Sequence, residues 1–545
     1  MRPMNMKNAI LKTRLLLAAV VAMASLHTTA HAAAPGITGT AFNLTAQAAY
    51  ITQPDGQSVY SWGYGCTTAP AAANFLPTAI TTGFCGTMQI PGPTLIVTEG
   101  VQVSVTLTNN LPTAAGNTSI LFPGLNVTAT SGAPGLLTQE AAPGGTVTYT
   151  FTPSSPGTRA YYSGTQGDLQ VEMGLYGAII VLPAAPVSGN ACVGDLQGKN
   201  DLARSNWKES NFRLATSAYD NALTCYDREY LFQFSEMDPN IHTQAEAQVQ
   251  AKSGCTAGAA GCSLNVPTEP YHPAYFMING RSMPDDMDPN YAPQYPHQPY
   301  NGNPHMHPGE MVLLRIIGQG RWQHPFHEHA NHVRILARDG NLILSPSGKG
   351  LAGPALFTTT TTPGLAMDGI FYYTGRGLNW DMYGHNTNSA DAIGNLVCTP
   401  DANGYNTGDP TAVNYYEWCQ DHDKPLETSP LGDVGGGGPV TLPNANILTN
   451  GAWYGGSAYL GPNATMRATG CAPSGSPQSN SPNCSSTGVT PPSGTIANSP
   501  GGEAGYAFMW HSHNEREITT NNIFPGGMMM MMLVDSREFQ IDESN

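Results

Sequence analysis

Short runs of alternating apolar and polar residues recur along the chain, bounded by glycine, proline or asparagine. Residues 93–112 alternate on both sides of Glu99-Gly100, a pattern that predicts a β-hairpin. Residues 146–152 and 177–182 have the same character and complete a first β-rich unit. Side chains on a strand point alternately to its two faces, so each run predicts a strand that buries one face.

A second β-rich unit opens at residue 229, after a polar, loop-like segment at 187–228 that we interpret as a linker. Residues 386–504 are rich in Gly, Asn, Ser and Pro and show little periodicity, so we expect a long insertion there. The strands expected in the second unit are at 229–234, 275–281, 310–317, 332–337, 507–510 and 528–534. In the last of these, the run Met528–Met532 alternates into the core, and we favour a buried strand over a copper-thioether site.

Composition supports an all-β protein. Only 11% of the residues are charged, whereas the 61 glycines and 44 prolines disfavour long helices. The formal net charge of −16 disfavours a nucleic-acid partner, which requires a basic face.

The N-terminus has the pattern of a secretory signal peptide. Basic residues precede the apolar run at 15–26, and Ala30-His31-Ala32 follows it as a cleavage pattern. We therefore predict a signal peptide at 1–32 and a mature protein that is secreted or periplasmic. No later run approaches the ~18 apolar residues of a transmembrane segment.

Ten cysteines in an exported chain favour disulfides over metal thiolates, because the compartment is oxidising and no CxxC pair occurs. Neighbours in the sequence suggest five pairs, with connectivity left open: Cys66/Cys85, Cys192/Cys225, Cys255/Cys262, Cys398/Cys419 and Cys471/Cys484.

Histidines carry the candidate chemistry. His327 and His329 would share one face of a strand, and so would His511 and His513. Two such strands side by side would offer four imidazoles to a metal ion, and imidazole suits Cu, Zn, Fe and Ni. A third pair, His305 and His307, precedes Pro308-Gly309, where we favour a solvated loop over an accessory copper site.

Several motifs resemble the multicopper oxidases, the laccase-like family. They are residues 91–100, 108–112 and 170–181 for the family's first cupredoxin domain, and Ile278-Asn-Gly-Arg281, Pro308-Gly-Glu310, His324-Pro-Phe-His-Glu-His329, Asp339-Gly340, Trp510-His-Ser-His513 and Gly527-Met528 for its last copper domain. The resemblance implies tandem cupredoxin-like Greek-key β-sandwiches with a long disulfide-stapled insertion. We place the N-terminal domain at 33–186 and the C-terminal copper domain at 229–545, interrupted by the insertion at 386–504. Three domains are the alternative.

The chain also departs from the family pattern. The first domain of the family supplies two His-x-His pairs to a trinuclear copper cluster, but residues 121–123 and 161–165 contain no histidine here. At the mononuclear blue-copper site, Ser512 stands in place of the cysteine and Glu517 in place of the second histidine, which leaves His324.

The residues that remain predict a reduced, histidine-only copper site. The expected metal ligands are His324, His327, His329, His511 and His513, and Glu517 is the candidate for catalysis. Because carboxylates lie nearby in the sequence, Fe or Mn is also compatible. Glu328 should point away from its histidine neighbours.

The predicted function is a secreted copper-dependent oxidoreductase. Its partner would be a small-molecule or metal-ion electron donor, with dioxygen as a further candidate, and we expect no nucleic acid and no membrane span. The alternatives are a non-catalytic periplasmic or extracellular copper-binding protein, and a cupredoxin scaffold that serves protein contacts. The substrate and the oligomeric state do not follow from the sequence.

Overall fold

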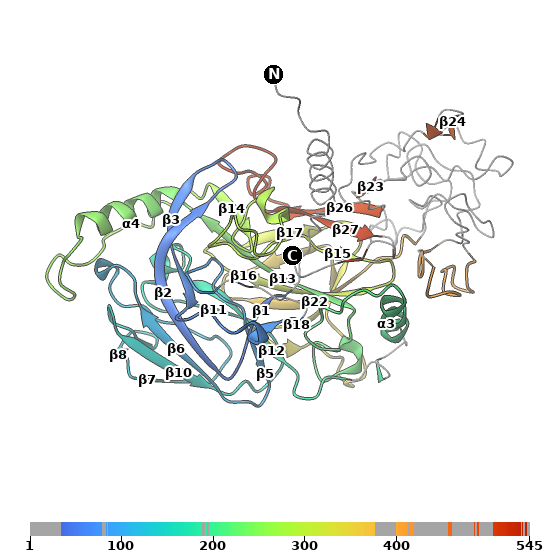
Figure 1. Ribbon diagram of the computed structural model, residues 1–545, viewed down its shortest axis with the longest axis horizontal. Coiled ribbons are helices and arrows are strands. Elements are labelled where there is room, and N and C mark those ends of the chain that lie inside the picture. The colour runs from blue at the N-terminus through green and yellow to red at the C-terminus, as the bar shows by residue number, and fades with distance from the viewer. Residues whose placement is uncertain are drawn as a thin grey trace, which may run out of the picture.

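The structure is a computed structural model in which β-strands dominate (Figure 1). It describes residues 34–78, 83, 85–187, 191–192, 196–376, 399–412, 414–418, 420, 456–459, 484–485, 488–489, 505–535, 537 and 540–541. The predicted signal peptide and most of the predicted insertion lie outside these residues. Within them, no helix is both long and apolar enough to cross a membrane.

The N-terminal strands form two five-stranded sheets, in the orders β11-β12-β5-β1-β4 and β3-β2-β6-β10-β7. Between them lies an apolar core that includes Trp62, Tyr64, Tyr149 and Tyr161. The strands are β1 (Gly36–Thr38), β2 (Ala41–Thr52), β3 (Ser58–Cys66), β4 (Phe75–Leu76), β5 (Leu95–Thr98), β6 (Val103–Asn109), β7 (Val127–Thr130), β10 (Thr146–Phe151), β11 (Gly157–Tyr162) and β12 (Tyr176–Leu182), with a small separate ribbon of β8 (Ala133–Pro134) and β9 (Gln139–Glu140).

The predicted hairpin at 93–112 is wrong, although both of its strands exist. β5 pairs in parallel with β12 and β1, whereas β6 pairs with β10 and β2 in the opposite sheet. The reason is that β5 is covered on both faces: Leu95 and Val97 pack into one core cluster and Ile96 into another. Gly100, with φ of +74°, lies where the chain crosses between the sheets.

The C-terminal strands form a second sandwich. One sheet has the order β14-β13-β16-β22-β18-β19, with β20 beside β18, and the other has the order β15-β27-β26-β17-β21, with β23 beside β26. The strands are β13 (Arg228–Met237), β14 (Tyr275–Ile278), β15 (His305–Met306), β16 (Met311–Gly318), β17 (His324–Glu328), β18 (Val333–Arg338), β19 (Asn341–Leu342), β20 (Ala355–Leu356), β21 (Thr358–Thr361), β22 (Ala366–Tyr372), β23 (Gly456–Tyr459), β26 (Gly505–Ser512) and β27 (Met529–Asp535); a further ribbon joins β24 (Cys484–Ser485) to β25 (Gly488–Val489).

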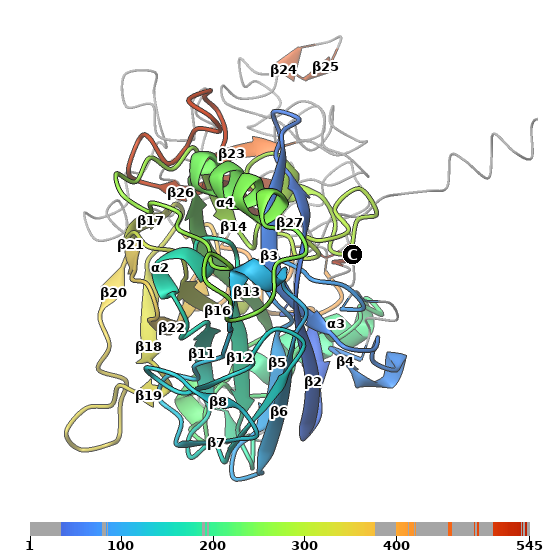
Figure 2. The ribbon, with the colours of Figure 1, turned by 90° about the vertical axis from the view of Figure 1, so that its left-hand side faces the viewer.

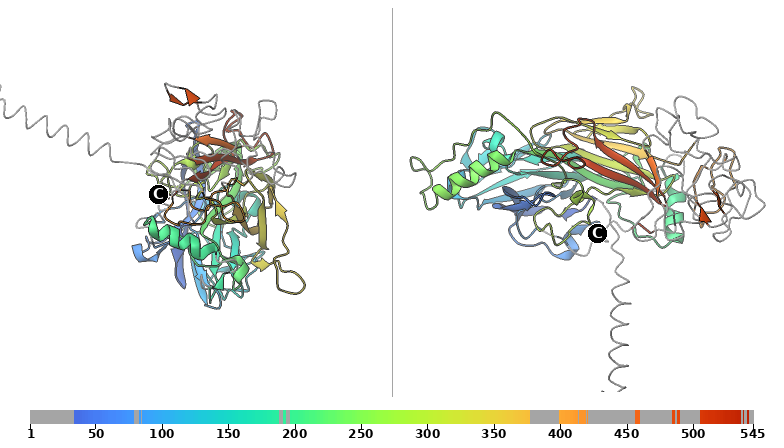
Figure 3. Two further views of the ribbon diagram at one scale, coloured as in Figure 1. Left: turned by 90° about the vertical axis from the view of Figure 1, so that its right-hand side faces the viewer. Right: turned by 90° about the horizontal axis from the view of Figure 1, so that it is seen from above.

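Strands from both sides of the predicted insertion share one sheet. β17 and β21 precede residues 386–504, and β26 and β27 follow them, yet β17 pairs with β21 and β26, and β26 pairs with β27. The two red strands β26 and β27 run side by side in Figure 3. β23, from within the predicted insertion, adds a further strand beside β26.

Methionines in β27 alternate as the sequence predicts. Met528, Met530 and Met532 are fully buried in the core between the two C-terminal sheets, together with Val534. Met531 points to the other face and is only partly buried. The interpretation of this run as a buried strand is confirmed.

The two longest helices among the described residues were not expected from the sequence. α3 (Leu196–Asn206) lies in the predicted linker, and α4 (Pro239–Ala251) follows β13. The buried residues of α3 include Gln197, Asn200 and Arg204, so its inner face is polar. The sequence therefore lacks the helical spacing of apolar residues by which a helix is predicted. α4 begins where the Asp238 side chain accepts a hydrogen bond from the backbone of Asn240.

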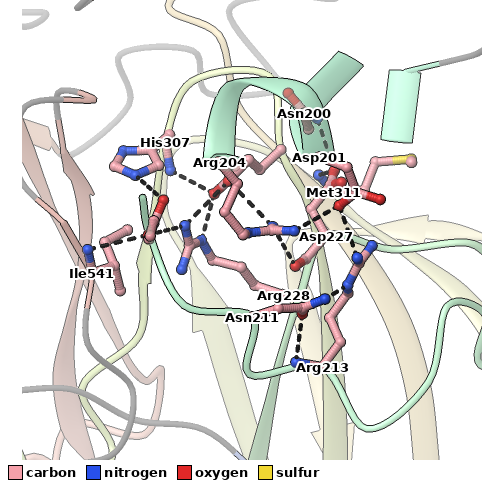
Figure 4. Close-up of polar contacts among 12 residues, drawn as sticks. Asn200, Asp201, Arg204, Asn211, Arg213, Asp227, Arg228, His307, Met311 and Ile541 are labelled. Carbon is pink, nitrogen blue, oxygen red and sulfur yellow. Dashed lines mark hydrogen bonds and ion pairs between the residues drawn. The ribbon is translucent and has the colours of Figure 1, made fainter. Parts of the chain in front are cut away.

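A buried ionic network explains why α3 has a polar inner face (Figure 4). Arg204 donates to the carbonyl of Asp227 at 2.8 Å, and Arg228 pairs with both Glu209 and Glu310. From the C-terminal end of the chain, Arg537 reaches Glu310 at 3.3 Å. The network therefore ties the 187–228 segment and the C-terminus to the end of β13.

Three of the predicted disulfides are confirmed: Cys66–Cys85, Cys192–Cys225 and Cys255–Cys262. The other two predicted pairs each include a residue outside the described ranges. Among the described residues no cysteine is free.

Core packing by β27 can be tested with two neighbouring methionines. We expect Met530→Ala to lower the free energy of unfolding by about 2–5 kcal/mol, because it leaves a cavity in the core. Met531→Ala, on the other face, should cost well under half as much. Chemical denaturation of both variants measures the difference, and equal losses would contradict the assigned faces.

Candidate metal centre

The register of β17 against β26 brings the two His-x-His pairs together. His327 lies directly opposite His511, and Phe326 lies opposite Ser512. Phe326 and Trp510 belong to the core between the C-terminal sheets, so alternation places His327 and His511 on the outer face of their sheet. β17, β21 and β26 lie next to one another in Figure 2.

Four imidazoles form a compact cluster on this face. The ring centroids of His327 lie 4.9 Å from both His329 and His513, and those of His329 and His511 lie 5.1 Å apart. The shortest polar approach is between the Nε2 atoms of His329 and His511, at 3.3 Å. His327, His329 and His511 are buried, whereas His513 is exposed.

Hydrogen bonds to Nδ1 orient two of the rings. The Nδ1 atom of His327 lies 2.8 Å from the Thr358 hydroxyl, and that of His511 lies 2.8 Å from the Ser512 carbonyl oxygen. The Ser512 carbonyl only accepts, so His511 carries its proton on Nδ1, and its Nε2 has a lone pair. Metal-binding histidines are held in this way by their second nitrogen.

The spacing of one pair of imidazole nitrogens fits a metal ion. Two nitrogen ligands about 2.0–2.1 Å from one tetrahedral metal ion lie roughly 3.3 Å apart, as do the Nε2 atoms of His329 and His511. The same distance also fits an N–H···N hydrogen bond between the rings. Among the described residues, no group of three or more His, Cys, Asp or Glu side chains already converges as ligands. The structure thus shows one closely spaced pair with two further imidazoles beside it.

The electrostatics of the cluster favour neutral rings. Burial, followed by the neighbouring imidazoles, lowers the pKa of His327 to about 4. Burial also lowers the pKa of His511. Since a metal ion binds neutral imidazole, these two rings are ready to bind it at neutral pH.

The cluster has an open side. The side chain of Phe357 is 47% exposed, and its ring lies 5.6 Å from that of His327 and 4.9 Å from that of His332, centroid to centroid. Phe357 and the exposed His513 thus lie on the solvent-exposed side of the imidazoles.

His324 stands apart from the other predicted ligands. It is fully buried on the inner side of the sheet, where its Nε2 lies 2.9 Å from Glu236 and its Nδ1 lies 2.9 Å from Glu517. Burial opposes a charge on this ring, but the two carboxylates outweigh it and raise the pKa of His324 to about 9. With both nitrogens held, His324 is better placed as a buried cation than as a metal ligand.

Glu517, the predicted catalytic residue, is part of the same inner group. Besides contacting His324, its carboxylate accepts hydrogen bonds from the Ser512 hydroxyl and, at 2.9 Å, from the Asn514 amide. The carboxylate therefore lies behind the strand that carries His511 and His513, which favours a positioning role for Glu517 over direct chemistry.

Glu328 also lies on the inner side of β17. Its carboxyl accepts a hydrogen bond from Thr359 at 2.6 Å, and burial raises its pKa to about 8. It is therefore largely neutral at pH 7 and sits opposite Trp510 in the sheet.

His305 and His307 are not on a solvated loop, so that prediction is wrong. Both are buried. The Nδ1 of His305 contacts Asp535 at 2.6 Å, and the two nitrogens of His307 contact the Asp535 carbonyl oxygen and, at 3.1 Å, Glu209. These contacts join the pair to the ionic network of Figure 4.

An aromatic cluster fills the places where the family's first domain carries histidines. Phe122 packs 5.9 Å from both Tyr149 and Tyr161, and Tyr161 packs 5.7 Å from Tyr64, measured between ring centroids. The Tyr161 hydroxyl donates to the Pro93 carbonyl oxygen. These side chains stabilise the core of the N-terminal sandwich.

Sequence reasoning missed Glu236, Thr358 and Phe357. Glu236 is a charged residue near the end of a strand that is buried throughout, which is a signal for a buried partner. Thr358 and Phe357 lie in and beside β21, in a threonine run without a recognisable motif.

Comparison with known proteins agrees with the resemblance inferred from the motifs. The multicopper oxidase family model matches residues 74–186. A multicopper oxidase of Talaromyces pinophilus is 36% identical over 98 residues, which is 17% of this chain and 15% of that protein. Laccase 1 of Metarhizium acridum is 36% identical over 104 residues, 18% of this chain and 16% of that protein. The blue copper oxidase from Nitrosomonas europaea aligns over 90% of this chain and 85% of its own, at 13% identity and a TM-score of 0.41.

The fold and the site thus define an all-β protein of two β-sandwiches with a candidate metal centre. The predicted resemblance to the laccase-like multicopper oxidases is confirmed, and residues 74–186 match the multicopper oxidase family model. The chain spans only about 15% of the length of the Talaromyces pinophilus and Metarhizium acridum relatives. The family implies copper, and nothing in the comparisons supports Fe or Mn.

The buried charge on His324 makes stability depend on pH. Because folding raises the pKa of this ring from about 6.5 to about 9, its stabilising contribution is complete below pH 6.5 and is lost as the pH rises through 9. We expect the melting temperature to fall more steeply from pH 7 to 10 in the wild type than in His324→Gln. Thermal denaturation across this range checks the slope, and parallel curves would refute a charged His324.

Proposed function

We propose that this protein is a secreted, copper-dependent oxidoreductase with a histidine-only copper site. The observation that carries the proposal is the 3.3 Å approach of the His329 and His511 Nε2 atoms within a four-imidazole cluster. The partial match to multicopper oxidases supports copper as the metal. The described disulfides and the signal-peptide pattern support export to an oxidising compartment.

In this proposal His327, His329, His511 and His513 hold the metal. The Thr358 hydroxyl and the Ser512 carbonyl hold the Nδ1 atoms of His327 and His511, so that the Nε2 atoms would be the ligands. Bound copper would supply one-electron redox chemistry. An electron donor, a small molecule or a metal ion, would approach past Phe357 and the exposed His513. The final acceptor in this proposal is dioxygen.

A blue-copper centre is not part of the proposal. The intense colour of such a centre comes from a cysteine thiolate bound to copper, and Ser512 stands at that position. The Ser512 hydroxyl donates to Glu517 and is thus already engaged. Electrons would therefore enter at the histidine cluster itself.

A second candidate, a non-catalytic copper-binding protein, is favoured by one specific observation. At the position of the family's mononuclear copper, His324 contacts Glu236 and Glu517 instead of a metal ion. A copper ion there would pass electrons from a surface donor to the cluster, and this arrangement offers no such relay. A single histidine cluster would suffice to store or carry copper.

Metal analysis with matched variants tests the site. We expect the purified, copper-loaded wild type to retain copper and to be nearly colourless. His329→Ala/His511→Ala should lose most of the metal, because it removes the closest pair of nitrogens. His272→Ala, at an exposed histidine outside the cluster, is the control and should bind as the wild type does. An intense blue solution, or full retention in the double variant, would contradict the assignment.

Oxygen consumption separates the two functions. With phenols or reduced metal ions as donors, an oxidoreductase should consume dioxygen in proportion to donor, and the double variant should not. If the wild type retains copper without consuming dioxygen, the copper-binding alternative holds.

A further inference from the structure

A chain of buried contacts lies directly behind the histidine cluster. His324 bridges two carboxylates, with 2.9 Å contacts to Glu236 and to Glu517. All three side chains are at most 2% exposed. We call these three residues together with Ser512 the carboxylate clamp.

One end of the clamp is fixed by backbone amides. The Glu236 carboxylate accepts hydrogen bonds from the amides of Arg321 at 2.6 Å and Trp322 at 2.9 Å. Because these residues lead directly into β17, Glu236 and His324 together set where that strand begins. The strand carries His327, and His329 follows directly after its end.

The other end fixes the segment that carries His511 and His513. The Glu517 carboxylate accepts from the Ser512 hydroxyl and from the Asn514 side chain, and the Glu517 amide donates to the Asn514 carbonyl oxygen at 2.8 Å. Ser512 lies between the two histidines and projects to the opposite face. An anchor on Ser512 therefore determines where both imidazoles project.

The clamp also reaches the N-terminal sandwich. The Tyr271 hydroxyl lies 2.6 Å from Glu172 and 3.3 Å from Glu236. Glu172, which lies between α2 (Gly167–Gln170) and β12, also accepts from the Asp238 amide at 2.6 Å. The contacts are thus continuous from the N-terminal sandwich, through His324, to the strand that carries His511 and His513.

We propose that the carboxylate clamp positions the histidine cluster, with His324 as its bridging cation and Glu236 and Glu517 as positioning residues. A cation between two carboxylates fixes both by charge-assisted hydrogen bonds, which are short and directional. The clamp holds β17 and the 511–514 segment at a set separation, so that the imidazoles on the outer face stay within reach of one metal ion. This inference rests on the proposed function, because it deepens the account of the same site.

The test compares His324→Gln and Ser512→Ala with a matched control. His242→Gln is the control, because His242 is equally buried but its contacts are to the Tyr60 carbonyl oxygen and to Glu172 rather than to the four clamp residues. We expect His324→Gln to weaken copper binding about 10- to 100-fold and to alter the Cu(II) EPR spectrum, as loss of a residue that orients ligands typically does. His242→Gln should lower the melting temperature but leave affinity and spectrum unchanged.

Ser512→Ala removes one hydroxyl and keeps the fold, so it serves if His324→Gln does not fold. It should weaken copper binding several-fold and alter the EPR spectrum in the same direction. Wild-type affinity and an unchanged spectrum in a folded His324→Gln or Ser512→Ala would overturn the proposal.

A readout without metal distinguishes failure of the clamp from failure of the proposed function. In metal-free protein, ring ¹⁵N NMR should show His511 as one tautomer with its proton on Nδ1, and both variants should mix the tautomers. If the wild type binds no copper but the variants mix the tautomers, the copper function fails and the clamp stands. If the tautomer is the same in all proteins, the clamp is refuted.

Discussion

The antiparallel pairing of β17 with β26 is the constraint on which the site depends. It sets His327 opposite His511 and Phe326 opposite Ser512. Residues that are opposite each other point to the same face of the sheet, so the two histidines share one face and Phe326 and Ser512 share the other. A slip of one residue would direct the imidazoles into the core and Phe326 to the outer face. The register is held by the core side chains Phe326, Phe508 and Trp510 and by the methionines of β27.

The same alternation gives the two faces different chemistry. On the outer face, burial and the neighbouring imidazoles lower the pKa of His327 and His511. On the inner face, a charged His324 satisfies two buried carboxylates, which would otherwise be costly to bury. In the family resembled, a cysteine and a second histidine would bind copper on the inner face. In this chain Ser512 and Glu517 replace those two ligands. The protonated ring of His324 supplies the positive charge that a copper ion would supply there.

Much of this arrangement follows from local sequence. The period of two predicts most strands of both sandwiches, and it brings the members of each His-x-His pair together because each pair spans the end of a single strand, β17 or β26. The partners of His324 do not follow in this way, since Glu236 is 88 residues away and their contact depends on how the two sheets pack. Helix α3 was not predicted because its inner face is polar. Asn200 and Arg204 on this face form hydrogen bonds with Asp227, which is distant in the sequence. The hairpin at 93–112 failed because alternation reports which residues are buried and not which strand is the partner.

The central claim is that the outer face of this sheet binds copper through imidazoles alone. The most direct test is a crystal structure of the copper-loaded protein, with anomalous scattering measured at the copper edge. The account predicts a peak about 2.0–2.1 Å from the Nε2 atoms of both His329 and His511, with His327 or His513 completing the ligands. A peak beside His324 and Ser512, at His305 and His307, or no peak at the cluster, would contradict it.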